Sequence, residues 1–302
     1  MTPEFLPPDS AYAAPTWALP AEDPLVTPSG AGVNGWFQRI SGTFKRSWKS
    51  LLLIFAITTL LPTIVLAVAG VLAVVFFLVP FQKELVAASA TGREPDFQFD
   101  TDVPADVVVV GVVFLIGLLF LQLAGYAAAA YAATREAAGL PVTVGESLGY
   151  GLRRCAGLLG WNLVTGLLIG LGTLACLLPG IYVAAATALV GPVYLFERQR
   201  PIARSFEIFH RNFGRILGRL ALIVAIAYGG SIVVGIVESI ANAALGSTDP
   251  TVALPGAIGV SVFGTVLRLP LTIFLVIGVL LTYAEQRGHE APATSASLAA
   301  EL

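Results

Sequence analysis

Two ionisable residues lie inside long apolar runs, where a charge is costly unless it is paired or functional. Arg268 lies in the run of residues 257–283, and Glu238 lies in the run of residues 216–245. A helical rise of about 1.5 Å per residue places Arg268 about 22 Å from Tyr283, with Glu238 at a similar depth. We predict that the two side chains form an ion pair. A structural ion pair, an arginine that extends toward the headgroups and a transport role are all compatible with the sequence.

Other residues within the apolar runs could hold helices together or line a polar site. The amides of Gln122 and Asn162 could form interhelical hydrogen bonds or line a polar cavity. Small residues at four-residue spacing predict close helix packing, and they are Gly166 with Gly170, and Ala124 with Ala128 and Ala132.

The chain offers little for catalysis or metal binding. Its only histidines are His210 and His289, which are too few for a histidine-rich metal site or a catalytic triad. Cys155 and Cys176 lie at opposite ends of one predicted helix, about 31 Å apart by helical rise, which is far beyond disulfide reach. Neither a P-loop motif nor a dinucleotide-binding motif occurs. We therefore predict a protein that is not an enzyme and that holds no metal or cofactor.

Ten basic residues lie just before or at the start of three apolar runs, on predicted amphipathic helices. In the third of these helices, apolar residues recur every three or four positions between Ile202 and Leu220, which aligns them on one helical face. Such a helix lies in the headgroup region, where each cation contributes about 1 kcal/mol beside an anionic leaflet. Simple anchoring and selective lipid binding both fit this pattern. The predicted headgroup-binding residues are Arg39, Lys45, Arg46, Lys49, Arg153, Arg154, Arg204, Arg211, Arg215 and Arg219.

The composition indicates a membrane protein. Of the 302 residues, 56% are apolar and 12% are charged, and the mean hydropathy is +0.83. Because soluble globular proteins carry about 25% charged residues, we expect no separate soluble catalytic domain. The net charge of −2 also argues against nucleic-acid binding.

Six apolar runs approach or exceed the length of about 20 residues that a helix needs to cross the hydrocarbon core. The Pro179-Gly180 pair leaves room only for a tight turn between the third and fourth runs. We predict an all-α polytopic membrane protein with six transmembrane helices as three hairpins, each preceded by a basic amphipathic interfacial helix. The six runs are residues 51–78, 105–133, 158–178, 181–196, 216–245 and 257–283.

The distribution of basic residues predicts the orientation of the chain. Fourteen of the 17 Lys and Arg residues flank the runs on one side, which the positive-inside rule identifies as cytoplasmic. We expect a multi-pass protein of the bacterial inner membrane with both termini in the cytoplasm and an acidic outer loop at residues 81–104. Residues 36–287 form the predicted membrane domain, between a proline-rich disordered tail at residues 1–35 and a second disordered tail at residues 288–302.

Four short motifs resemble those of a known family. They are Leu178-Pro-Gly-Ile-Tyr182, Pro192-Val-Tyr-Leu-Phe-Glu197, Pro201-Ile-Ala-Arg-Ser205 and Phe213-Gly-Arg-Ile-Leu-Gly218. In these motifs the chain resembles the membrane domain of bacterial glycerophosphoryl diester phosphodiesterases and the related YciC-type inner-membrane proteins. The resemblance implies a six-helix inner-membrane protein associated with lipid or envelope processes. It implies no activity for this chain, because catalysis in that family belongs to a separate soluble domain.

The residues and the resemblance together favour a non-enzymatic integral membrane protein, acting as a scaffold or a lipid-interacting component of the bacterial cell envelope. The expected partners are anionic membrane lipids, together with envelope proteins or further copies of this chain in a homo-oligomer, and not nucleic acid. The alternative is a transporter or lipid-handling protein with a polar intramembrane cavity. That alternative predicts a cavity that contains Arg268, Glu238 and Asn162, whereas a scaffold predicts a closed bundle.

Overall fold

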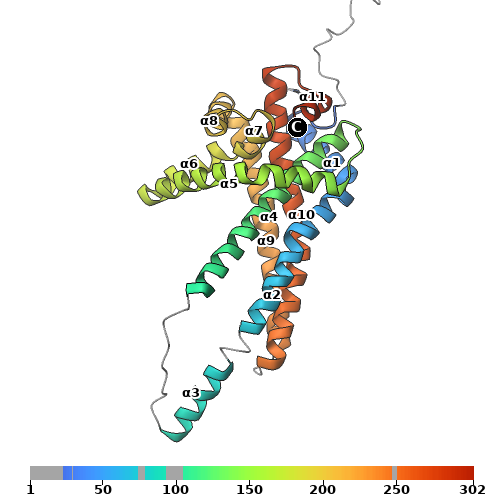
Figure 1. The fold of residues 1–302 in the computed structure, drawn as a ribbon. Helices are drawn as coiled ribbons and strands as arrows, with labels where there is room; N and C mark the ends of the chain where they lie inside the picture. Colours follow the sequence, from blue (N-terminus) through green and yellow to red (C-terminus); the bar gives the residue numbers. More distant parts are fainter. Residues whose placement is uncertain (1–22, 29, 74–78, 93–104, 247–249) are drawn as a thin grey trace, which may run out of the picture.

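The computed structural model describes residues 23–28, 30–73, 79–92, 105–246 and 250–302. Within these ranges all regular structure is helical (Figure 1). A π-helical turn, Ala56–Leu60, joins the first two helices. The helices are α1 (Gly32–Phe55), α2 (Leu61–Ala73), α3 (Val79–Thr91), α4 (Ala105–Ala137), α5 (Val144–Ala175), α6 (Leu177–Thr187), α7 (Val190–Phe196), α8 (Pro201–Arg211), α9 (Phe213–Leu245), α10 (Pro250–Glu290) and α11 (Ser295–Glu301).

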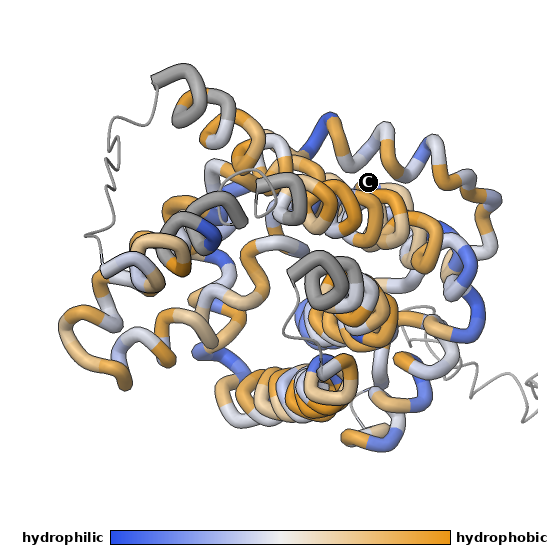
Figure 2. The backbone as a smooth tube through the Cα atoms, turned by 90° about the horizontal axis from the view of Figure 1, so that it is seen from below, coloured by the Kyte–Doolittle hydropathy of each residue, from blue (hydrophilic) through white to orange (hydrophobic). Residues whose placement is uncertain are grey.

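Six helical segments are long and apolar enough to cross a membrane. This confirms the prediction of an all-α polytopic membrane protein. Seen from below, the long helices are coloured predominantly hydrophobic (Figure 2). The six segments are Gly32–Gly70, Gly111–Ala137, Val144–Ala175, Leu177–Phe196, Phe213–Leu245 and Gly256–Glu290.

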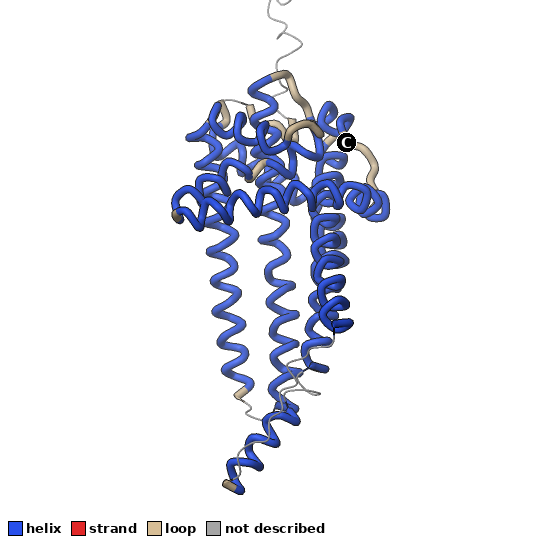
Figure 3. The backbone as a smooth tube through the Cα atoms, turned by 60° about the vertical axis from the view of Figure 1, so that its left-hand side comes forward, coloured by secondary structure: helices blue, strands red, loops and turns tan. Residues whose placement is uncertain are grey.

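The hairpin of α5 and α6 has a different direction from the other long helices. Helices α2, α4, α9 and α10 extend the same general way from one end of the molecule, whereas α5 and α6 lie across them (Figures 1 and 3). That end also holds α1, α7, α8 and α11, and we call this end of the molecule the basic end. Local sequence sets the length and apolarity of α5 and α6, while packing at the basic end sets their direction.

The outer part of this hairpin is apolar and exposed on most sides. Leu163 is 62% exposed, Leu167 is 63% exposed and Leu174 is 86% exposed. In the apolar 18-residue stretch of Val144–Ala175 only 6% is buried, whereas in the corresponding stretch of Gly256–Glu290 the buried share is 44%. A helix that is apolar on all sides is typical of a membrane-embedded segment and not of one that faces water.

Close helix packing occurs at one of the two predicted small-residue strips. Ala124, Ala128 and Ala132 of α4 are buried, and a side chain at Gly151 of α5 would collide with the Ala124 carbonyl. Gly166 and Gly170 pack against no other helix of this chain, because an added Cβ at either position would have no neighbour within 4 Å. Packing of this pair against a second copy of the chain stays a prediction. This part of α5 lies across the other long helices and projects away from them (Figure 1).

Only the third basic amphipathic segment is a separate helix. α8 begins at Pro201 after two residues in the left-handed region, Arg198 and Arg200, and it ends at Arg211, with Asn212 between it and α9. The first basic segment continues through the π-helical turn into α2, and Arg153 and Arg154 lie within α5. A continuous helix satisfies its own backbone hydrogen bonds as it enters the membrane, so a break forms only where the chain turns.

The predicted disordered tails are wrong wherever the structure describes them. Residues 23–28 pack against the core, with Leu25 and Val26 fully buried. Residues 1–22 and residue 29 lie outside the described part of the chain. At the other end, α10 continues to Glu290, and Leu298 of α11 is fully buried. Burial of these apolar side chains stabilises segments too short for hydropathy to mark. The ordered domain is therefore wider than residues 36–287.

The predicted outer loop at residues 81–104 begins as helix. Residues up to Thr91 belong to α3, while residues 93–104, with most of the loop's acidic side chains, lie outside the described part of the chain. The core lies instead at the opposite, basic end, where Trp36, Phe209 and Tyr283 are fully buried. These aromatic side chains fix α1, α8 and α10 relative to one another.

Candidate functional site

Arg268 and Glu238 form the predicted ion pair between α10 and α9. The Nη1 atom of Arg268 lies 2.5 Å from Oε1 of Glu238, and Nη2 lies 2.7 Å from Oε2. Gly264 makes room for this bidentate contact, because a Cβ at that position would overlap the Glu238 carboxylate. Pairing neutralises two charges that would be costly in lipid if either stood alone. The pair therefore stabilises the α9–α10 hairpin.

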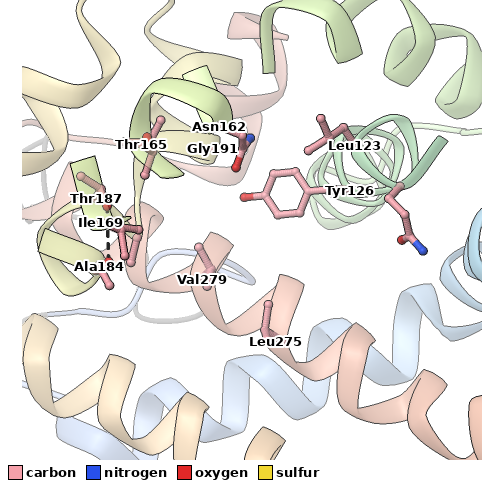
Figure 4. A pocket seen from close by; sticks show the side chains of 13 residues that line it. Leu123, Tyr126, Asn162, Thr165, Ile169, Ala184, Thr187, Gly191, Leu275 and Val279 are labelled. Atoms are coloured by element: carbon pink, nitrogen blue, oxygen red, sulfur yellow. Dashed lines mark hydrogen bonds between the residues drawn. The ribbon is translucent and has the colours of Figure 1, made fainter. Parts of the chain in front are cut away.

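A cavity of about 370 Å³ with a mainly apolar lining lies where α4, α10 and the α5–α6 hairpin with α7 meet (Figure 4). The predicted polar residues Gln122 and Asn162 both line it, whereas Arg268 and Glu238 are not among its lining residues. The structure thus brings together one pair of predicted residues and places the other pair elsewhere. The further polar residues of the lining are Tyr126, Thr165 and Thr187.

The polar groups of this cavity are partly engaged by their own helices. Asn162 donates to the Leu158 carbonyl at 2.8 Å, and Thr187 donates to the Val183 carbonyl at 2.7 Å. The hydroxyl of Thr165 has no hydrogen-bond partner among the described residues. These groups can therefore offer a small number of hydrogen bonds to a neutral polar group within an otherwise apolar wall.

Tyr126 was missed by sequence reasoning, although it points into the cavity toward Asn162 and Gly191 (Figure 4). Gly191 makes room for it, since a Cβ there would lie 2.7 Å from the tyrosine hydroxyl. The available signal was a hydroxyl group within a helix of mostly apolar residues. That signal is weak, because tyrosine is also common in apolar cores.

Most of the ten predicted headgroup-binding residues are accessible. The six that are exposed are Lys45, Arg46 and Lys49 of α1, Arg153 of α5, Arg211 of α8 and Arg215 of α9. Trp48 is 45% exposed, and the Lys49 Nζ lies 5.7 Å from the centroid of its ring. An exposed tryptophan beside cations is typical of a membrane interface. Arg39 and Arg154 are half-buried.

The prediction of headgroup binding is wrong for Arg219, whose side chain is only 4% exposed. Its guanidinium lies 3.2 Å from the Glu285 carboxylate and 5.1 Å from the centroid of the Trp36 ring. It also donates to the Gly32 carbonyl at 2.8 Å. Arg219 therefore joins α9 to α10 and α1, because a buried acid partner outcompetes any headgroup.

Arg204 is also committed within the protein. It binds Glu197 at 2.9 Å and Glu207 at 3.2 Å, and it forms a hydrogen bond with Glu290. Burial lowers the pKa of the Arg204 guanidinium, but the bonds to Glu290 and Glu197 outweigh it and raise this pKa above its ordinary value. Its predicted role at headgroups is therefore replaced by a role in holding α8 against α10. The sequence hid this network because its acids come from distant segments.

The fold and these sites define an all-α polytopic integral membrane protein. Comparison with protein-family models, with curated proteins and with solved structures finds no match for this chain. Within the described residues, no three His, Cys, Asp or Glu side chains are grouped so that they could hold a metal ion.

Proposed function

We propose that this protein is a non-enzymatic, lipid-interacting component of the bacterial inner membrane, with its basic end on the cytoplasmic side. The observation that carries this proposal is the exposed apolar α5–α6 hairpin, which lies across the long helices at the level of the basic end (Figure 1). A hairpin in that position lies in the leaflet beneath the headgroups, so the same leaflet contacts the exposed cations of α1, α8 and α9.

The exposed cations supply the electrostatic part of this interaction. Lys45, Arg46 and Lys49 lie within five consecutive residues of α1, and Arg211 at the end of α8 lies four residues before Arg215 in the first turn of α9. Each contributes about 1 kcal/mol near an anionic surface. Five such residues at one end provide both orientation and a preference for anionic over zwitterionic lipids.

The resemblance of residues 178–218 to the membrane domain of glycerophosphoryl diester phosphodiesterases supports the same proposal. We propose that the chain corresponds to the membrane domain of those proteins and acts together with envelope proteins or with a second copy of itself. These residues cover most of α6, all of α7 and α8, and the start of α9. Of these elements, α6, α8 and the start of α9 belong to the surface that the proposal places against lipid.

A second candidate function is lipid handling through the polar cavity. The observation that favours it is the position of Gln122, Tyr126 and Asn162 beside the lipid-exposed hairpin. A cavity of about 370 Å³ can hold the polar part of an amphiphile while the chains of that amphiphile remain in the bilayer. Replacing Ala184, which lines the cavity, by Trp would then abolish retention of a bound amphiphile in native mass spectra of the detergent-extracted protein.

Lipid selectivity can be measured with spin-labelled lipids in reconstituted bilayers. The wild-type protein is expected to immobilise phosphatidylglycerol in preference to phosphatidylcholine, and the variant Lys45→Gln with Arg46→Gln, Arg211→Gln and Arg215→Gln is expected to lose that preference. The control is Lys83→Gln, which removes an exposed cation from α3 at the opposite end (Figure 1). Equal immobilisation of both lipids by the wild type would refute the proposal.

A further inference from the structure

A second, more polar pocket lies at the basic end, between the last turns of α4 and the first turns of α5. Its volume is about 600 Å³. Positions at four-residue spacing on both helices face it, so one face of each helix forms a wall. The lining consists of Tyr131 and Arg135 of α4, Gly145, Glu146, Gly149, Tyr150 and Arg153 of α5, and Leu302.

Two aromatic side chains join the α4 wall to the α5 wall. The rings of Tyr131 and Tyr150 stack with their centroids 4.6 Å apart. Arg135 lies with its guanidinium carbon 5.4 Å from the centroid of the Tyr131 ring and donates to the Tyr131 hydroxyl at 3.0 Å. A guanidinium held in this way is preorganised for a ligand, because it loses little freedom on binding.

The side chains that line the pocket carry a net positive charge, because they include two arginines and one glutamate. Neither Arg135 nor Arg153 forms an ion pair with another described residue. The one acidic side chain in the lining, Glu146, is committed to the capping of α5, where its Oε2 accepts from the Thr143 N–H at 3.1 Å. The main-chain oxygen of Leu302 accepts from Arg198 at 3.1 Å.

The α5 wall leaves room for a ligand. Gly145 and Gly149 lie one turn apart near the start of this 32-residue helix, and a Cβ added at either would meet no atom within 4 Å. Two guanidiniums without an ion-pair partner among the described residues and two tyrosines therefore surround the same space.

We propose that this pocket binds a phosphate group, with Arg135 and Arg153 as its two cationic ligands. Arginine suits this role because its planar donors match the oxygens of phosphate. The phosphate can belong to a lipid headgroup, in which case the pocket deepens the proposed function and rests on it. It can equally be a free phosphate from the cytoplasm, which does not depend on the proposed function.

The test compares two glycine variants of the full-length protein in detergent. Gly149→Leu fills the pocket without changing any charge, while the control Gly160→Leu makes the same change on the same helix at another open position outside the pocket. Binding of phosphatidylglycerol is measured by native mass spectrometry, and binding of inorganic phosphate is measured by equilibrium dialysis. A third variant, Arg135→Gln with Arg153→Gln, removes the two cations.

We expect the double Gln variant to weaken binding by about tenfold or more, because it loses charged hydrogen bonds. We expect Gly149→Leu to weaken binding as strongly, because its side chain occupies the space of the ligand, while Gly160→Leu binds as the wild type does. Binding of phosphatidylglycerol alone identifies a headgroup site, and binding of inorganic phosphate as well identifies a free anion. The proposal is overturned if the wild type binds neither probe, or if Gly149→Leu binds as tightly as Gly160→Leu. Because neither glycine variant alters a charge, this result does not depend on the surface cations of the proposed function.

Discussion

The carboxylate of Asp23 caps the last helix of the chain at Ser295, 272 residues further along the sequence. One oxygen accepts the Ser295 main-chain N–H at 2.9 Å, and the other accepts the Ser295 hydroxyl at 2.8 Å. The oxygen that bonds the hydroxyl also accepts from the N–H groups of Leu25 and Val26. One buried side chain thus fastens the N-terminal segment and α11 to each other at the basic end.

Replacing Asp23 by Ala should release α11. The variant loses a helix cap and leaves buried N–H groups without acceptors, so we expect a loss of about 2 kcal/mol in local stability. Hydrogen exchange measured by mass spectrometry should show faster exchange for residues 295–301 and unchanged exchange for α9. Unchanged exchange in α11 would show that the cap contributes nothing.

The ion pair of Arg268 and Glu238 should act as one unit. Arg268→Met leaves a carboxylate unpaired, which should cost about 3 kcal/mol, and adding Glu238→Gln should cost little more. Unfolding by denaturant in detergent micelles measures each step of this double-mutant cycle. Additive losses would mean that the two side chains contribute separately.

Gly264→Ala should disrupt the same pair through space alone. Alanine is the better helix former by about 1 kcal/mol, but its Cβ would overlap the Glu238 carboxylate. We therefore expect a net loss of stability at Gly264 and a small gain for the control Gly259→Ala, which lies on α10 with no atom near its added Cβ. A gain at both positions would contradict the observed geometry.

Arg219 should be required for folding rather than for lipid binding. Arg219→Met strands the buried Glu285 carboxylate and should cost about 4 kcal/mol. The neighbouring exposed variant Arg215→Gln should leave the unfolding midpoint nearly unchanged. Equal unfolding midpoints for Arg219→Met and Arg215→Gln would contradict a structural role for Arg219 and would favour the original prediction of headgroup binding.

The direction of α5 can be read from a depth profile. Nitroxide labels at the native Cys176 and at Leu167→Cys and Leu171→Cys, each in a chain without other cysteines, report immersion depth through their accessibility to oxygen and to a nickel complex. If the hairpin lies in one leaflet, the three depths should be similar. A profile that is deepest at residue 167 would mean instead that α5 crosses the membrane.

Part of the site was predictable because its chemistry is local to the membrane. An unpaired charge inside the hydrocarbon core is costly, so Arg268 was predicted to pair with an acid. Glu238 was the acid at a similar depth in the neighbouring apolar run. The same reasoning selected Gln122 and Asn162, which meet in one cavity. It could not select Tyr126, whose role depends on the space that Gly191 leaves on another helix.

Composition and periodicity alone determined the helical class, the number of apolar segments and the identity of the basic stretches. These properties depend on neighbours within a few residues, since helix formation and apolarity are local. The tertiary structure decided which arginines remain exposed, which direction α5 and α6 take, and that residues 23–28 and 295–301 are ordered. Each of these depends on a partner far away in the chain, as Glu285 is for Arg219 and Asp23 is for Ser295, and such contacts leave no local pattern.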